Sequence, residues 1–239
     1  EGTYSVSWQV LSADDGHFSK GAFAFSVGAG ASSAASPVEQ QAEVVASSTF
    51  REGVTIWVEL LGQAILLGTL VVSVFIWRKI KTRGSPSIPE YEKRAERRLA
   101  ILMLIGGVLV LVGIVAYLLV KVSGLLEIQP VPFFQRLAPF RATVDGRYLL
   151  VRGALAVVFL AVFLFSKQRI VNARRVTGAE VILLLLVLLI TLDRARVSHA
   201  AASQFLPALS VMMNWIHLVF KELWVGGLVA MTVAVLPAA

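Results

Sequence analysis

Residues 208–236 read ALSVMMNWIHLVFKELWVGGLVAMTVAVL, a run long and apolar enough to cross a lipid bilayer. The run contains one histidine, His217, and ionisable side chains at membrane depth are costly enough to indicate a functional site. Met213 precedes His217 by four residues and therefore shares its helix face. A thioether beside an imidazole suits Cu(I). The alternative is that His217 bonds a neighbouring helix and Met213 fills space.

The composition is that of an integral membrane protein. Of the 239 residues, 57% are hydrophobic and 15% charged, whereas about a quarter are charged in a soluble protein. The mean hydropathy is +0.77. The net charge of +7 arises from basic residues beside apolar runs, so we expect no nucleic-acid binding. Because the chain has no cysteine, disulfides, zinc–thiolate sites and thiol catalysis are excluded.

The apolar runs predict a mainly α, polytopic membrane domain at 51–239 with about five transmembrane helices. The expected spans lie near 53–77, 99–120, 148–165, 179–197 and 208–236.

Charge then predicts the orientation of these spans. Basic residues dominate 78–98 and 166–178, which we expect to be cytoplasmic. The N-terminus and residues 121–147 then lie outside. The prolines and aromatics of 121–147 indicate a segment at the membrane surface rather than a span. Arg152, one turn inside the third span, is expected to snorkel to the surface.

A β-hairpin is predicted before the membrane domain. Apolar and polar residues alternate over 4–11 and again over 22–27, with a turn-rich connection between them. An isolated hairpin is marginal in water, so partner strands are expected upstream or from another subunit. Residues 29–50 are rich in Gly, Ala and Ser and predict a flexible linker.

The hairpin resembles a known family. Tyr4–Ala13, then Asp15-Gly16-His17, then Gly21–Val27 is similar to the last two strands of the copper resistance protein C family (CopC), small periplasmic β-sandwiches that bind Cu(II). The resemblance implies that residues 1–28 belong to an incomplete CopC-like sandwich and that Asp15 and His17 are copper ligands. Carboxylate and imidazole suit Cu(II). The alternative is a solvated histidine in a turn, and Asp14 is an extra residue relative to the family motif.

The membrane domain resembles the copper resistance protein D family (CopD). The resemblance rests on Ser198-His199-Ala200-Ala201, on His217-Leu218 and on Leu223–Leu228, read LWVGGL. Thr143–Arg152 also resembles a segment that opens a helix in that family. The resemblance implies copper movement across the inner membrane, with His199 beside Met213 and His217. Lys221 and Glu222 stand where the family has small or apolar residues.

Two functions therefore remain open for this chain. One is copper capture at the periplasmic face of a bacterial-type inner membrane, with transfer to a His/Met site in a multi-pass domain. The other is a structural or accessory subunit of a larger membrane complex, built on a CopD-like scaffold without transport. A bis-histidine haem site is weaker, because only His217 lies clearly within a span. No enzyme is expected, since no nucleophile–base pair, phosphate loop or paired carboxylate is present.

Overall fold

A computed structural model describes residues 2–11, 18–27, 38–82, 89–124, 132–198 and 206–236. The chain divides into two compact units. One unit comprises Glu1–Thr55 and Ala116–Arg147, and the other comprises Ile56–Val115 and Tyr148–Ala239. Helices α1 (Val38–Val71) and α3 (Pro89–Gly124) contribute residues to both units. Because α1 begins at Val38, residues 38–50 of the predicted linker are helical.

The predicted hairpin is present in the first unit. Strands β1 (Gly2–Leu11) and β2 (Phe18–Val27) pair antiparallel, from Gly2 opposite Val27 to Leu11 opposite Phe18. The rings of Tyr4 and Phe25 stack with centroids 5.6 Å apart. Trp8 lies across Gly21, where a Cβ atom would come within 2.3 Å of the indole. The hairpin leaves one apolar face exposed, formed by Tyr4, Val6, Trp8, Val10, Phe23, Phe25 and Val27.

A short helix, α4 (Phe133–Ala142), also belongs to this unit. Its ten residues extend roughly 15 Å, too little to cross a bilayer, as predicted for this part of the chain. The start of the next helix needs glycine at position 146, because a Cβ atom on Gly146 would lie 2.1 Å from the carbonyl oxygen of Phe140. At the preceding position, Asp145 Oδ2 accepts a hydrogen bond from the Tyr117 hydroxyl at 2.8 Å.

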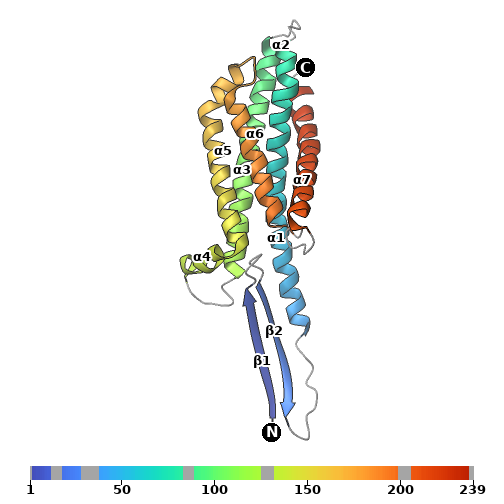
Figure 1. Cartoon of the computed structure of the whole chain (residues 1–239), viewed down its shortest axis with the longest axis vertical. Helices are drawn as coiled ribbons and strands as arrows, with labels where there is room; N and C mark the ends of the chain where they lie inside the picture. Colours follow the sequence, from blue (N-terminus) through green and yellow to red (C-terminus); the bar gives the residue numbers. More distant parts are fainter. Residues whose placement is uncertain are drawn as a thin grey trace. The chain divides into compact units, whose positions relative to one another are not determined.

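The second unit is a bundle in which parts of α1, α3, α5, α6 and α7 run alongside one another (Figure 1). Helix α5 spans Val144–Asn172, α6 spans Gly178–Arg196 and α7 spans Pro207–Val229. Within the described residues, four helical segments are long and apolar enough to cross a membrane: Phe50–Lys81, Glu90–Ser123, Val144–Asn172 and Pro207–Val235. By length and composition the chain is therefore a multi-pass membrane protein.

The fifth predicted span, 179–197, forms α6 but is not among these four segments. The physical reason is its charge, since Glu180, Asp193, Arg194 and Arg196 lie within 19 residues. A helix of this length still extends roughly 28 Å, close to the thickness of the hydrocarbon core.

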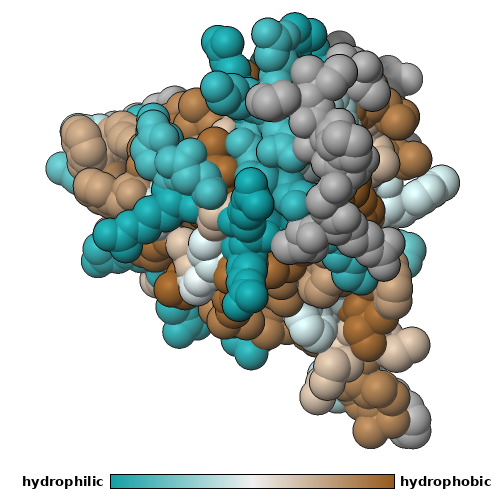
Figure 2. Space-filling view, turned by 90° about the horizontal axis from the view of Figure 1, so that it is seen from above, coloured by the Kyte–Doolittle hydropathy of each residue, from teal (hydrophilic) through white to brown (hydrophobic). Residues whose placement is uncertain are grey.

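The two basic segments meet at one end of the bundle. After α1 the chain continues as the π-helix η1 (Val72–Trp77) and as α2 (Arg78–Thr82). There Arg78 donates to the carbonyl oxygen of Ile170, at 2.6 Å, and to that of Ala173. Figure 2 looks onto the end that carries α2, where hydrophilic residues gather. The contacts of Arg78 therefore bring the described start of segment 78–98 to segment 166–178 at one end of the bundle, which agrees with the prediction that they lie on one side of the membrane.

The apolar core near this end joins α1, η1, α3 and a second π-helix, η4 (Ala230–Val235). Its buried members are Ile65, Val72, Trp77, Ala95, Leu99, Leu102, Ala230, Ala234 and Val235.

Helices α1 and α7 approach each other closely at two glycines. A Cβ atom on Gly226 would lie 1.7 Å from the carbonyl oxygen of Ala64, and one on Gly68 would lie 2.0 Å from the carbonyl carbon of Gly226. Small residues of this kind let transmembrane helices pack backbone to backbone. Gly226, which lies in the LWVGGL segment, is thus at a crossing point of two spans.

Candidate functional site

The predicted His/Met pair lies on the outer surface of α7. Met213 is 60% exposed and His217 is also exposed, and their spacing puts them on one helix face. Phe220 and Trp224, 66% and 72% exposed, continue that face. The indole of Trp215 instead donates to the carbonyl oxygen of Leu188 on α6, at 3.2 Å. His217 therefore points away from the bundle, toward lipid or another polypeptide.

The other predicted ligands lie outside the described residues. Asp15 and His17 fall in 12–17, between the paired ends of β1 and β2, and His199 falls in 199–205, between α6 and α7. Within the described part of the chain, no group of three or more His, Cys, Asp or Glu side chains could hold a metal ion. Met213 and His217 alone supply two donors, so copper bound there would need a third donor from elsewhere.

The most unusual feature of the bundle is a buried ion cluster centred on Arg152 of α5. Its guanidinium Nε lies 2.8 Å from Glu59 Oε1 on α1, and its Nη1 donates to Asp193 Oδ2 on α6 at 3.0 Å. Arg152 and Glu59 are fully buried and Asp193 is only 6% exposed. The prediction that Arg152 snorkels to the surface was wrong, because both partners lie within the bundle.

Local packing positions this cluster. Gln63, one turn after Glu59, is fully buried and its Nε2 donates to Glu59 Oε1 at 2.8 Å. Helix α3 packs closely against the same turn of α1, as shown by Gly113, whose added Cβ atom would lie 2.6 Å from the Glu59 backbone nitrogen. Among the described residues, Glu59 Oε2, Gln63 Oε1 and Arg152 Nη2 are buried without a hydrogen-bond partner. The cluster thus keeps spare donors and acceptors in the interior.

A second buried acid, Glu222 of α7, lies close to this cluster. It is fully buried, and its Oε2 lies 2.9 Å from the hydroxyl oxygen of Thr191 on α6. Its other oxygen, Oε1, has no hydrogen-bond partner in the described structure. The charges of Glu59 and Lys221 both act on it. Glu222 therefore adds a third acidic group beside a cluster whose cation is Arg152.

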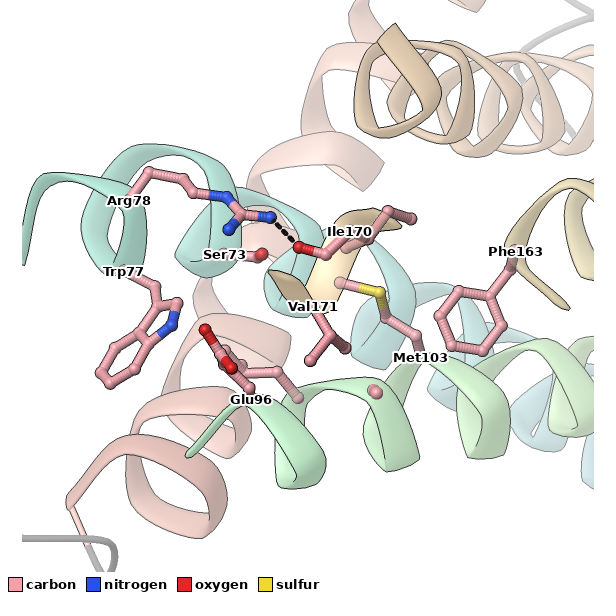
Figure 3. Close-up of a pocket in the computed structure, with 10 residues that line it drawn as sticks. Ser73, Trp77, Arg78, Glu96, Met103, Phe163, Ile170 and Val171 are labelled. Carbon is pink, nitrogen blue, oxygen red and sulfur yellow. Dashed lines mark hydrogen bonds between the residues drawn. The ribbon is translucent and has the colours of Figure 1, made fainter. Parts of the chain in front are cut away.

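A separate ion pair lies at the end that carries the basic segments. Arg78 Nη2 lies 2.8 Å from Glu180 Oε1, and Ser73 donates to the same oxygen at 3.2 Å. Glu180 also completes a capping box with Thr177 at the start of α6. The neighbouring cavity is lined by Trp77, Met103 and Phe163 (Figure 3) and measures about 20 Å³, room for about one water molecule. We assign this pair to the joining of helix ends.

Sequence reasoning missed the interior cluster, although two signals were present. Glu59 and Gln63 are four residues apart in an apolar run, which puts two polar side chains on one buried face. Arg152 and Glu222 are charged residues inside predicted spans, and such residues usually face the bundle interior and pair there. The sequence near each residue could not reveal which residues pair, because the partners come from different helices.

Comparison with known families supports only the N-terminal part of the resemblance. A CopC domain matches residues 1–28, the hairpin and the connection that carries Asp15 and His17. CopC domains belong to copper-binding, non-enzymatic proteins, and this partial match suggests a link to copper resistance. CopD was not identified. Comparisons with curated proteins and with solved structures gave no match.

Proposed function

We propose that this chain is a copper-handling protein of a bacterial-type inner membrane, with its N-terminus on the periplasmic side. The single observation that carries the proposal is the CopC match at residues 1–28, attached to a multi-pass membrane domain. In the proposed sequence of events, Asp15 and His17 capture Cu(II) outside. Copper then passes to a site of His199, Met213 and His217 in a CopD-like membrane domain.

The chemistry of the donors supports this order. Carboxylate and imidazole suit Cu(II), whereas thioether and imidazole suit Cu(I), so the second site would receive copper after its reduction. The proposal therefore requires an external one-electron reductant between the two sites. If α6 is a fifth crossing, the basic residues of the two segments favour a topology with both segments in the cytoplasm and the start of α7 outside.

Cellular copper accumulation tests the membrane site. His217→Ala and Met213→Ala are expected to lower accumulation relative to the wild type at equal protein levels. Met212→Ala is the matched control, because Met212 is a similarly exposed methionine, 52%, about 100° further around the helix. Unchanged accumulation in His217→Ala, or an equal loss in Met212→Ala, would contradict the proposed site.

A second function is favoured by the outward position of His217. The exposed face of Met213, His217, Phe220 and Trp224 offers aromatic and imidazole groups to a neighbouring span. On this alternative the chain is an accessory subunit of a larger membrane complex. Isolation from its native membrane would then yield stoichiometric partner chains and no copper by elemental analysis, whereas the copper function predicts copper in the isolated protein.

A further inference from the structure

Glu222 belongs to the buried face of α7 and takes no part in the proposed copper sites. Leu218, Glu222 and Gly226 follow one another at four-residue steps and are the buried residues of α7. Gly226 packs on the Ala64 carbonyl group of α1, so Glu222, one turn away on the same face, also lies against the bundle. Its side chain is fully buried. Among the described residues no cation lies within ion-pair distance of it.

The contacts of Thr191 indicate the protonation state of Glu222. The Thr191 hydroxyl oxygen is 2.9 Å from Glu222 Oε2 and 3.1 Å from the carbonyl oxygen of Val187. A hydroxyl group carries one hydrogen, so it cannot donate to both oxygens. If Glu222 is a neutral acid, its O–H donates to Thr191 and Thr191 donates to Val187. Both contacts are then satisfied hydrogen bonds, whereas an ionised Glu222 would compete with Val187 for the single hydrogen.

The surrounding charges favour the same state. Three groups act on Glu222 from the elements packed against it: Thr191 on α6, Glu59 on α1 and Lys221 on α7 itself. Glu59 is acidic and opposes a second negative charge. Lys221 is partly exposed and makes no ion pair with Glu222 within the described structure. Arg152, the cation of the neighbouring cluster, is already shared between Glu59 and Asp193. Ionised, Glu222 would be an uncompensated charge inside a membrane domain.

We propose that Glu222 is a proton-binding site within the bundle, with its carboxyl group protonated at neutral pH and hydrogen-bonded to Thr191. One proton is taken up from solution per carboxylate, and no other reactant is needed. The unpartnered Glu59 Oε2 and Gln63 Oε1 supply further acceptors in the interior. On this proposal the membrane domain carries an exchangeable proton at Glu222.

Infrared spectroscopy of the full-length protein in lipid nanodiscs tests the proposal. At pH 7 the wild type is expected to show the C=O stretch of a protonated carboxylic acid, shifted when H₂O is replaced by D₂O. Glu222→Gln is expected to lose this band. Glu180→Gln is the matched control, because Glu180 is equally buried but paired with Arg78, and the band should persist at full intensity.

A second pair of variants keeps Glu222 in place, so it remains informative where Glu222→Gln does not fold. Thr191→Val removes the hydroxyl group and should move the acid band to higher frequency, because the acid loses its hydrogen-bond acceptor. Thr191→Ser keeps the hydroxyl group and should leave the band at the wild-type position. Absence of the band in the wild type at pH 7, its full survival in Glu222→Gln, or no shift in Thr191→Val would overturn the proposal.

Discussion

Replacing Arg152 by glutamine should destabilise the bundle far more than replacing its partner Glu59. Arg152→Gln leaves Glu59 and Asp193 buried without a cation. Breaking a buried ion pair from one side in this way costs about 3–5 kcal/mol. Glu59→Gln instead leaves the Arg152–Asp193 contact at 3.0 Å intact and electrically neutral. We therefore expect a clear asymmetry between the two variants in the free energy of unfolding.

The pH dependence of Arg152→Gln follows from how the remaining carboxylates can respond. Binding a proton at pH 7 costs a carboxyl group of ordinary pKa about 4 kcal/mol, which limits the penalty for each stranded charge. That cost falls by about 1.4 kcal/mol for each unit by which the pH is lowered, because the same carboxyl groups stay ionised in the unfolded chain until the pH reaches their ordinary pKa. The deficit of Arg152→Gln relative to wild type should therefore shrink as pH falls from 7 toward 5.

The assay is equilibrium unfolding in mixed lipid–detergent micelles, followed by tryptophan fluorescence. Arg94→Gln provides a matched control, because Arg94 pairs with Glu90 at 3.1 Å while both side chains are more than half exposed. Such a surface pair contributes no more than about 0.5 kcal/mol. The reasoning would be refuted if Arg152→Gln lost no more stability than Arg94→Gln or Glu59→Gln, or if its deficit did not change with pH.

Further substitutions test the helix crossing and the cap of α6. Gly226→Ala should prevent the close approach of α7 to α1 and lower the unfolding midpoint sharply. Gly227→Ala is the control, because its Cβ atom would meet nothing within 4 Å and the variant should unfold like the wild type. Equal midpoints for the two variants would show that the crossing is misplaced. Thr177→Ala should cost about 1 kcal/mol of stability in the same unfolding assay, because it removes the cap of α6, and a change near zero would argue against the capping box.

The sequence predicted the elements well, since long apolar runs and strict alternation are local signals. It predicted four segments that form candidate spans, and it predicted the hairpin; the cytoplasmic side assigned to the basic segments stays a prediction. It could not decide which way a given side chain faces. Helical periodicity puts Met213 and His217 together, but whether that face turns inward depends on packing against α1 and α6. The contact at Gly226 turns it outward.

For Arg152, too, the sequence could not decide which way the side chain faces; it was expected at the membrane surface and is buried. An arginine near a span end can reach the membrane surface or pair within the bundle, and both outcomes satisfy its local sequence. The choice depends on Glu59 and Asp193, which come from two other helices. In the sequence, Glu222 stood where the CopD family has small or apolar residues. The structure shows that its side chain is buried and contacts Thr191 inside the bundle.

Copper binding by the full-length protein tests the proposed function most directly. The purified protein would be equilibrated with Cu(II) in the presence of a weak competing chelator, desalted and analysed for copper by mass spectrometry. We predict that copper is retained by the wild type and by Asp14→Asn, and that retention falls in Asp15→Asn and His17→Ala. Copper no higher than the buffer background in the wild type, or equal losses in Asp14→Asn and Asp15→Asn, would contradict the account.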